Sequence, residues 1–303
     1  MIISESFVKL SALSIRFSKG TGIDLIFMEF WTKTLIWIIK LLTALFNIFV
    51  REAWIPPDWK TSIVRQLYKK QGSRNQVNNY RPISNICTIS RIFEKVIFYF
   101  LDKSVSPSLS RKQFGFKKAK STLTNTLESY YQVFKYLDDK IPVDLITIDF
   151  SKAFDKVDLT ILMNKLINFS ISSQLLNILR SILFDLKQIT VVDDKYSDAG
   201  IITSGVPQGS TLSPLLLKIF IHDLLQIPFT NHISAYADDL KIFGKTGIDL
   251  QKDLDLIEKW ARVNHMNINE NKCELIQFGS HNPCNKYQLT ARLILCTRNN
   301  AYT

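Results

Sequence analysis

The spacing of apolar and polar residues along the chain predicts a mixture of helices and strands. Apolar positions at helical spacing predict helices over residues 25–50, 88–102, 121–137, 158–168, 173–184, 214–225 and 250–265. Short apolar or alternating runs predict strands over residues 62–67, 143–150, 189–192, 199–202 and 274–278, with a hairpin over 233–243. A basic, Asn-rich segment over 69–82 is predicted to be a loop. Helices mixed with hairpins predict an α+β fold with antiparallel strands.

The predicted strand VDLITIDF, residues 143–150, carries apolar side chains on both faces. It is therefore expected to be buried on both sides until it reaches Asp149. A carboxylate at the end of a buried strand is costly unless it is solvated, paired or bound to a cation. From these residues alone, a strand-end cap and a metal ligand are about equally good interpretations of Asp149.

A second acidic position lies in AYADDLKIF, residues 235–243, where Asp238 and Asp239 fall at the tip of the predicted hairpin. Asp is a common turn residue, and the turn interpretation alone explains the doublet. Two acidic corners on neighbouring strands could instead bracket Mg²⁺, a hard ion that prefers oxygen ligands.

The chain has 303 residues, of which 46% are hydrophobic, and a formal net charge of +11. This composition excludes a disordered chain, and the positive charge favours a polyanionic partner such as nucleic acid. A basic surface can also serve solubility alone. The four cysteines form no Cys-x-x-Cys pair, which fits a reducing compartment rather than a disulfide scaffold; an intracellular protein is expected, in the nucleus, the cytoplasm or both, without a signal that chooses between them. A zinc site around His281 and Cys284 is a weaker alternative, since the spacing matches no standard site.

The most apolar segment is residues 25–50, but Glu29, Lys33 and Lys40 interrupt it. Its uncharged run, residues 41–50, is too short to cross a bilayer. We therefore expect an amphipathic helix packed on the domain and no stable membrane association, with a membrane-surface helix as the minor alternative.

Six blocks occur in an order that resembles the reverse transcriptases of non-LTR retrotransposons, the jockey-like and related elements. They are NNYRPIS (78–84), QFGFKKAKSTLTNTL (113–127), DFSKAFDKVD (149–158), SGVPQGSTLSPLL (204–216), AYADDL (235–240) and the W…NENKCELIQFG block (260–279). Upstream, KGTGIDLIFMEFW (19–31) looks like a degraded form of the block that begins such domains. The resemblance spans residues 19–279, and GVPQGS with YADD is its most specific part.

The resemblance implies a right-hand polymerase fold whose palm carries an antiparallel sheet. It places an N-terminal helical extension at 1–50, the fingers at 51–142, the palm at 143–279 and a remnant of the primer-grip and thumb region at 280–303. No primer-grip block, full thumb or endonuclease domain is visible. We therefore expect a truncated polymerase core, with the thumb incomplete or absent.

The resemblance also implies the catalytic residues. Asp149 and Asp238 match the metal-binding carboxylates, Asp239 the adjacent acid, and Phe150 a main-chain carbonyl ligand. Lys272 matches the lysine that protonates the leaving pyrophosphate. The cofactors implied are two Mg²⁺ ions, with Mn²⁺ as a substitute.

Other matching residues would bind the nucleotide and the template. Arg81, helped by Lys69 or Lys70, matches the triphosphate-binding arginine, and Phe154 the ring that excludes a 2′-hydroxyl. Gln208 and Gly209 match the segment lining the nucleotide pocket. Three lysines, Lys117, Lys118 and Lys120, are expected to contact template phosphates. The plainer interpretations are a solvated basic loop for the cations, a core Phe for Phe154 and a simple turn for Pro-Gln-Gly.

Two positions depart from the family pattern: Lys218 replaces an apolar residue, and His222 stands where Asn is common. The function implied is RNA-directed DNA polymerase, with an RNA template, a DNA primer and deoxynucleoside triphosphates as partners. The main alternative is a catalytically impaired, nucleic-acid-binding fragment of a degenerate retroelement. A maturase-like splicing cofactor would share the fold but need an RNA-binding extension, which is not visible.

Overall fold

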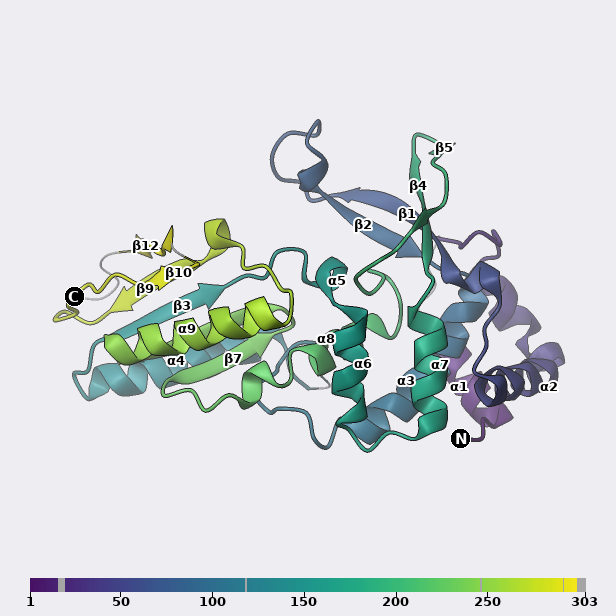
Figure 1. Ribbon diagram of the computed structural model, residues 1–303, viewed down its shortest axis with the longest axis horizontal. Coiled ribbons are helices and arrows are strands. Elements are labelled where there is room, and N and C mark those ends of the chain that lie inside the picture. The colour runs from purple at the N-terminus through teal and green to yellow at the C-terminus, as the bar shows by residue number, and fades with distance from the viewer. Residues whose placement is uncertain (16–19, 118, 246, 291, 299–303) are drawn as a thin grey trace. The chain divides into compact units, whose positions relative to one another are not determined.

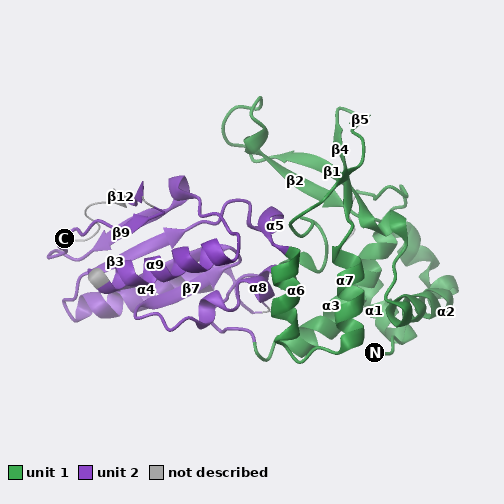
Figure 2. Cartoon of the chain, in the orientation of Figure 1, with its two compact units in different colours: residues 1–108, 159–216 green, residues 109–158, 217–303 purple. Residues whose placement is uncertain are grey.

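A computed structural model of the chain describes residues 1–15, 20–117, 119–245, 247–290 and 292–298. The chain forms two compact units, one of residues 1–108 and 159–216 and the other of residues 109–158 and 217–303 (Figure 2). The predicted ranges for fingers and palm describe functional parts of a polymerase, and they stay predictions. The two compact units have other boundaries, because residues 159–216 belong to unit 1 and residues 109–142 to unit 2.

Unit 1 combines a small sheet with a group of helices (Figure 1). Its helices are α1 (Glu5–Ser14), α2 (Met28–Glu52), α3 (Thr88–Val105), α6 (Leu159–Ile167) and α7 (Ser173–Leu183). Its strands are β1 (Thr61–Tyr68), β2 (Tyr80–Asn85), β4 (Lys187–Val192), β5 (Lys195–Tyr196) and β6 (Gly200–Ile201). The order is β2-β1-β4-β5, with β6 paired to β4. Helix α3 packs against α1, α2 and α7 and supplies much of this core.

The strand β2 replaces part of the loop expected over 69–82. It pairs antiparallel with β1, placing Pro82 opposite Gln66. β2 lies at the edge of the sheet, so one side of this strand has no neighbouring strand to bond to. Proline, which has no N–H to donate, is tolerated in such an edge strand. An edge strand can therefore include a proline that makes the sequence look like a loop.

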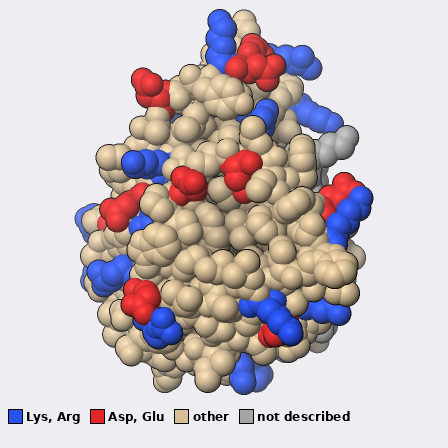
Figure 3. Space-filling view, turned by 90° about the vertical axis from the view of Figure 1, so that its right-hand side faces the viewer, with Lys and Arg blue, Asp and Glu red and all other residues tan. Residues whose placement is uncertain are grey.

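The long helix α2 packs on unit 1, as the sequence predicts, but only one of its faces is buried. Its buried side chains include Leu35, Leu42, Phe46, Phe49 and Val50. Its opposite face exposes Phe30, Ile36, Trp37, Leu41 and Ile48. Figure 3 views the molecule from the side on which α2 lies in Figure 1, and charged side chains are sparse in the middle of that face. By length and composition α2 could cross a membrane, and among the described residues it is the one such helix.

Unit 2 is built on a five-stranded sheet of order β12-β9-β3-β8-β7. Its strands are β3 (Val143–Ile148), β7 (His232–Tyr236), β8 (Asp239–Lys245), β9 (Glu274–Phe278), β10 (Gln288–Leu289), β11 (Arg292–Leu293) and β12 (Leu295–Arg298). Its helices are α4 (Thr122–Asp138), α5 (Ala153–Lys156) and α9 (Ile248–Val263), while α8 (Ser213–Phe220) spans the boundary between the units. The pairs β3–β8, β3–β9 and β7–β8 are antiparallel, as predicted, and the edge strand β12 is parallel to β9.

The central strand β3 is buried on both faces, as its pattern predicts. Val143 and Leu145 pack with Val133 of α4, Phe243 and Phe278. On the other face, Phe150 packs on Trp260 of α9, with ring centroids 5.9 Å apart. β3 is therefore packed on both faces, and the contact of Phe150 with Trp260 holds the backbone next to Asp149.

Candidate active site

The acidic residues predicted from the sequence meet at one end of the unit 2 sheet. Asp149 directly follows β3, whose last residue, Ile148, is paired with Leu240 of β8. Asp239 is the first residue of β8 and pairs with Tyr236 of β7, so Asp238 lies in the hairpin turn. Since β3 and β8 are adjacent, strand pairing alone places Asp149 beside the doublet.

The carboxylates lie close enough together to change the ionisation of Asp238 and Asp239. Burial first, and then the charges of Asp239 and Asp149, raise the pKa of Asp238 to about 6. Asp239 exposes more of its surface, yet desolvation followed by the charge of Asp149 also raises its pKa. The proximity of the Asp149 side chain raises the pKa of Asp239 further. Three acidic groups are thus held where a cation would relieve their repulsion.

One oxygen of Asp149 is held by two side chains from the segment before β9. Lys272 Nζ lies 3.2 Å from Asp149 Oδ2, and Asn269 Nδ2 donates to the same oxygen at 2.9 Å. The main-chain N–H of Asn269 also donates to the carbonyl of Asp149 at 2.8 Å. Lys272 was expected at the site from the sequence, whereas Asn269 was not. Asn269 could have been found from its position three residues before Lys272. A single 3₁₀ turn, Glu270–Lys272, follows Asn269 and brings both side chains to the same carboxylate.

The hairpin turn is held by Gln113, a second residue to which the sequence analysis gave no role. Gln113 is buried; its Oε1 accepts from the N–H of Ala237 at 3.0 Å, and its Nε2 donates to the carbonyl of Ala237 at 3.1 Å. Ala237 has a left-handed φ of 56°. A Cβ on Gly115 would lie 2.2 Å from the nitrogen of Ala237. The QFG motif therefore sets the position of the turn that carries Asp238.

Phe154 lies in the short helix α5 and meets Phe116 edge to face, with ring centroids 6.3 Å apart.

The two residues that depart from the family pattern both have hydrogen-bond partners. Lys218 is buried, and its ammonium donates to the carbonyl of Phe116 at 3.0 Å. A buried cation needs such an acceptor, which accounts for a lysine at an otherwise apolar position. The other departure, His222, accepts the N–H of Ser110 through Nδ1 at 3.2 Å.

The lysines expected at the template fall in different surroundings. Lys117 is exposed, and Lys118 lies outside the described residues. Lys120 is half-buried; its ammonium donates to the carbonyl of Arg111 at 2.8 Å and lies 3.5 Å from the ring centroid of Phe114. Burial lowers the pKa of Lys120. Lys117 is thus placed to meet solvent or a phosphate.

The remaining predicted residues lie in unit 1. Arg81 is an exposed residue of β2, opposite Leu67. Lys69 donates through Nζ to the carbonyl of Asn78, while Lys70 is exposed. Gln208 accepts the N–H of Ser84 through its carbonyl at 2.7 Å. Unit 1 therefore presents a basic β-hairpin and a Pro-Gln-Gly turn that is fastened to the base of that hairpin.

The donor set of unit 2 suits a hard divalent cation. Oxygen ligands, excess negative charge and partial burial are present at Asp149, Asp238 and Asp239. Within the described ranges, no group of three or more His, Cys, Asp or Glu side chains is arranged to hold a metal ion by itself. Mg²⁺ usually takes one or two carboxylates and completes its shell with water and substrate phosphates, so an open acidic corner fits it. Among the same residues, no such group surrounds His281 and Cys284, the zinc alternative.

The raised pKa of Asp238 predicts a pH-dependent stability for the metal-free protein. Its folded pKa of about 6 exceeds its ordinary value of 3.8, so folding favours the protonated form. The contribution of Asp238 to stability is therefore fully present below pH 3.8 and is lost as the pH rises through 6. In EDTA, the free energy of unfolding of Asp238→Asn minus that of the unmodified chain should be about 1–3 kcal/mol more positive at pH 8 than at pH 4. Urea unfolding at both pH values measures this, and an equal difference would contradict the burial of Asp238.

An antiparallel sheet that gathers carboxylates at one end, beside a lysine, defines a site suited to cation-assisted chemistry on phosphates. Residues 68–289 match the family described as "Reverse transcriptase (RNA-dependent DNA polymerase)". The match covers more than half of the chain, and the chain belongs to this family. Enzymes of this family generally use divalent metal ions. The predicted family is thereby confirmed.

Relatives and solved structures agree with this assignment. The "Probable RNA-directed DNA polymerase from transposon BS" of Drosophila melanogaster is 26% identical in an alignment of 286 positions, which covers 89% of this chain and 31% of that protein. The "RNA-directed DNA polymerase from mobile element jockey" of the same species is 27% identical, over 84% of this chain and 30% of that protein. The chain thus spans about a third of the length of these relatives.

The fold is also found in solved structures of telomerase. The apo telomerase of Candida tropicalis, truncated from its C-terminal domain, superposes with a TM-score of 0.55 at 14% identity. The superposition covers 89% of this chain and 59% of that one. At this identity it shows the fold alone, and it confirms the predicted α+β polymerase architecture.

Proposed function

We propose that the chain is the catalytic core of an RNA-directed DNA polymerase that extends a primer 3′-hydroxyl along an RNA template. The observation that carries the proposal is the meeting of Asp149, Asp238 and Asp239 at one end of the unit 2 sheet, beside Lys272. The relatives, named as RNA-directed DNA polymerases, support the same reaction.

In this reaction the 3′-oxygen of the primer forms a bond to the α-phosphorus of a deoxynucleoside triphosphate. The bond between the α-phosphorus and its bridging oxygen breaks, and pyrophosphate leaves. Two divalent ions, Mg²⁺ or Mn²⁺, would activate the attacking hydroxyl and stabilise the leaving group when bound. Asp149, Asp238, Asp239 and the carbonyl of Phe150 would hold them.

Other residues of unit 2 would position the substrate and move protons. Lys272 lies against Asp149 and would turn toward the pyrophosphate as general acid once a cation takes over that carboxylate. Phe154, supported by Phe116, would meet the sugar and exclude a 2′-hydroxyl.

Residues of unit 1 would bind the rest of the substrate. Arg81, with Lys69 or Lys70, would bind the triphosphate, where the guanidinium fork suits phosphate oxygens. Gln208 and Gly209 would line the nucleotide pocket, and Lys117, from unit 2, would contact template phosphates together with Lys118 and Lys120.

Primer extension on an RNA template tests the proposal. With a labelled DNA primer, all four deoxynucleotides and Mg²⁺, the chain should yield extended product, which EDTA should abolish. Asp238→Asn should remove the product while leaving template binding unchanged in a gel-shift assay. Template binding without any extension by the unmodified chain would favour the alternative, an impaired nucleic-acid-binding fragment.

A further inference from the structure

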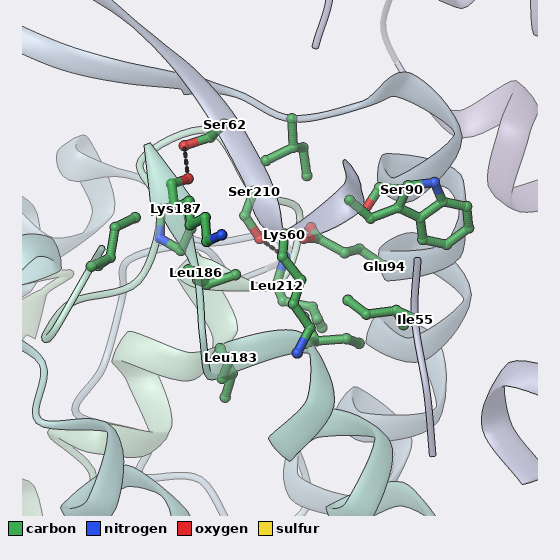
Figure 4. Close-up of a pocket in the computed structure, with 15 residues that line it drawn as sticks. Ile55, Lys60, Ser62, Ser90, Glu94, Leu183, Leu186, Lys187, Ser210 and Leu212 are labelled. Atoms are coloured by element: carbon green, nitrogen blue, oxygen red, sulfur yellow. Dashed lines mark hydrogen bonds between the residues drawn. The ribbon is translucent and has the colours of Figure 1, made fainter. Parts of the chain in front are cut away.

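A buried carboxylate in unit 1 contacts the loop that follows Gln208 and Gly209. Glu94 lies on α3 and is only 6% exposed. Its Oε2 accepts the hydroxyl of Ser210 at 2.7 Å and the main-chain N–H of Thr211 at 2.8 Å. Figure 4 shows Glu94 reaching Ser210 beside a small cavity. The carboxylate therefore binds the two residues immediately after the Pro-Gln-Gly turn.

The same turn is held from its other side by β2. The N–H of Ser84 donates to the carbonyl of Gln208 at 2.7 Å. A Cβ on Gly209 would lie only 2.4 Å from the carbonyl oxygen of Ser84, so the turn approaches that strand as closely as its backbone allows. The turn segment is thus held between β2 and α3, and Glu94 supplies a side-chain contact from α3.

A carboxylate at this position has a cost that an apolar side chain would avoid. Burial raises the pKa of Glu94, while the hydrogen bonds of Ser210 and Thr211 and the charge of Arg91 oppose the rise. The adjoining cavity has about 20 Å³, which is room for one water molecule. An apolar residue could fill such a space more cheaply, but it could not accept two directed hydrogen bonds. The carboxylate therefore contributes oriented hydrogen bonds to Ser210 and Thr211, which an apolar side chain cannot make.

We propose that Glu94 is a positioning residue that orients the Gln208–Gly209 turn toward the incoming deoxynucleoside triphosphate. The proposal rests on the proposed polymerase function. In this role Glu94 acts through Ser210 and Thr211, which donate hydrogen bonds to its carboxylate beside the nucleotide-lining segment.

Two substitutions of Glu94 separate positioning from folding. Glu94→Ala removes both hydrogen bonds, whereas Glu94→Gln keeps an acceptor oxygen of nearly the same shape. In primer extension, Glu94→Ala should raise the KM for deoxynucleotide about ten-fold or more with a smaller change in kcat, and Glu94→Gln should restore most of the loss. Ser90→Ala is the matched control, because Ser90 lines the same cavity from the same helix. It should leave KM unchanged.

Hydrogen exchange tests the orientation without depending on activity. In the nucleotide-free protein, peptides covering 208–212 should exchange faster in Glu94→Ala but not in Glu94→Gln or Ser90→Ala. Unchanged exchange in Glu94→Ala would overturn the proposal. If the unmodified chain is active and Glu94→Ala has the same KM for deoxynucleotide, the proposal is overturned as well. An unmodified chain without polymerase activity would instead overturn the proposed function, and with it the nucleotide role of Glu94.

Discussion

Replacing Asp149 with asparagine should lower the rate of primer extension at least about a thousand-fold, which corresponds to ~4 kcal/mol of transition-state stabilisation. The amide has nearly the shape of the carboxylate but no charge to balance a divalent cation. Its oxygen can still accept the hydrogen bond from Asn269 Nδ2, which in the native chain is 2.9 Å long. The fold should therefore survive while the metal site fails.

The matched control for this prediction is Asp138→Asn, an equal loss of charge at an exposed position at the end of α4. It should leave the rate within about two-fold, since isolated surface substitutions have small effects. Single-turnover extension at saturating Mg²⁺ measures both variants. Comparable rates for Asp149→Asn and Asp138→Asn would show that Asp149 holds no catalytic ion.

Replacing Gly209 with alanine should have the second large effect, because the new methyl group has no room. Gly209 has a φ of 129°, and its Cβ would lie 2.4 Å from the Ser84 carbonyl oxygen, a main-chain atom within the β1–β2 ladder. Strain and overpacking together should cost about 2–4 kcal/mol of unfolding free energy, or displace the turn. Displacement of the turn should lower deoxynucleotide incorporation about ten-fold or more.

Gly200→Ala provides the control in the same unit. Its Cβ would lie 4.0 Å from the nearest atom, the carbonyl oxygen of Gln188, which is ordinary contact. This variant should stay within about 0.5 kcal/mol of the native stability. Urea unfolding and primer extension on both alanine variants provide the measurement. If Gly209→Ala matched Gly200→Ala in both, the close packing of the turn on β2 would be refuted.

Features encoded in neighbouring residues were predictable from the sequence. Ser121 caps α4 and forms a capping box with Thr124, as a serine before a helical pattern indicates. The apolar faces of residues 143–148 identified the central strand, and the Asp238–Asp239 doublet identified the hairpin. These signals are local because helix caps, strand periodicity and turns involve residues close in sequence.

The supports of the site were not predictable, because their partners are distant in sequence. Gln113 and Ala237 are 124 residues apart, and Glu94 and Ser210 are 116 apart. A polar residue within an apolar pattern gives no indication of which distant main-chain group it will meet. Asp144 is similar: it is fully buried in β3 and accepts the hydroxyl of Tyr287 at 2.6 Å. Patterns therefore located the candidate ligands but not the residues that orient them.

RNA-templated DNA synthesis can be measured by single-nucleotide incorporation on four RNA templates that differ only in the first unpaired base. With Mg²⁺ present, we expect each template to direct addition of its complementary deoxynucleotide and Asp149→Asn to add none. Addition of the same nucleotide on every template, or addition that persists in Asp149→Asn, would contradict it.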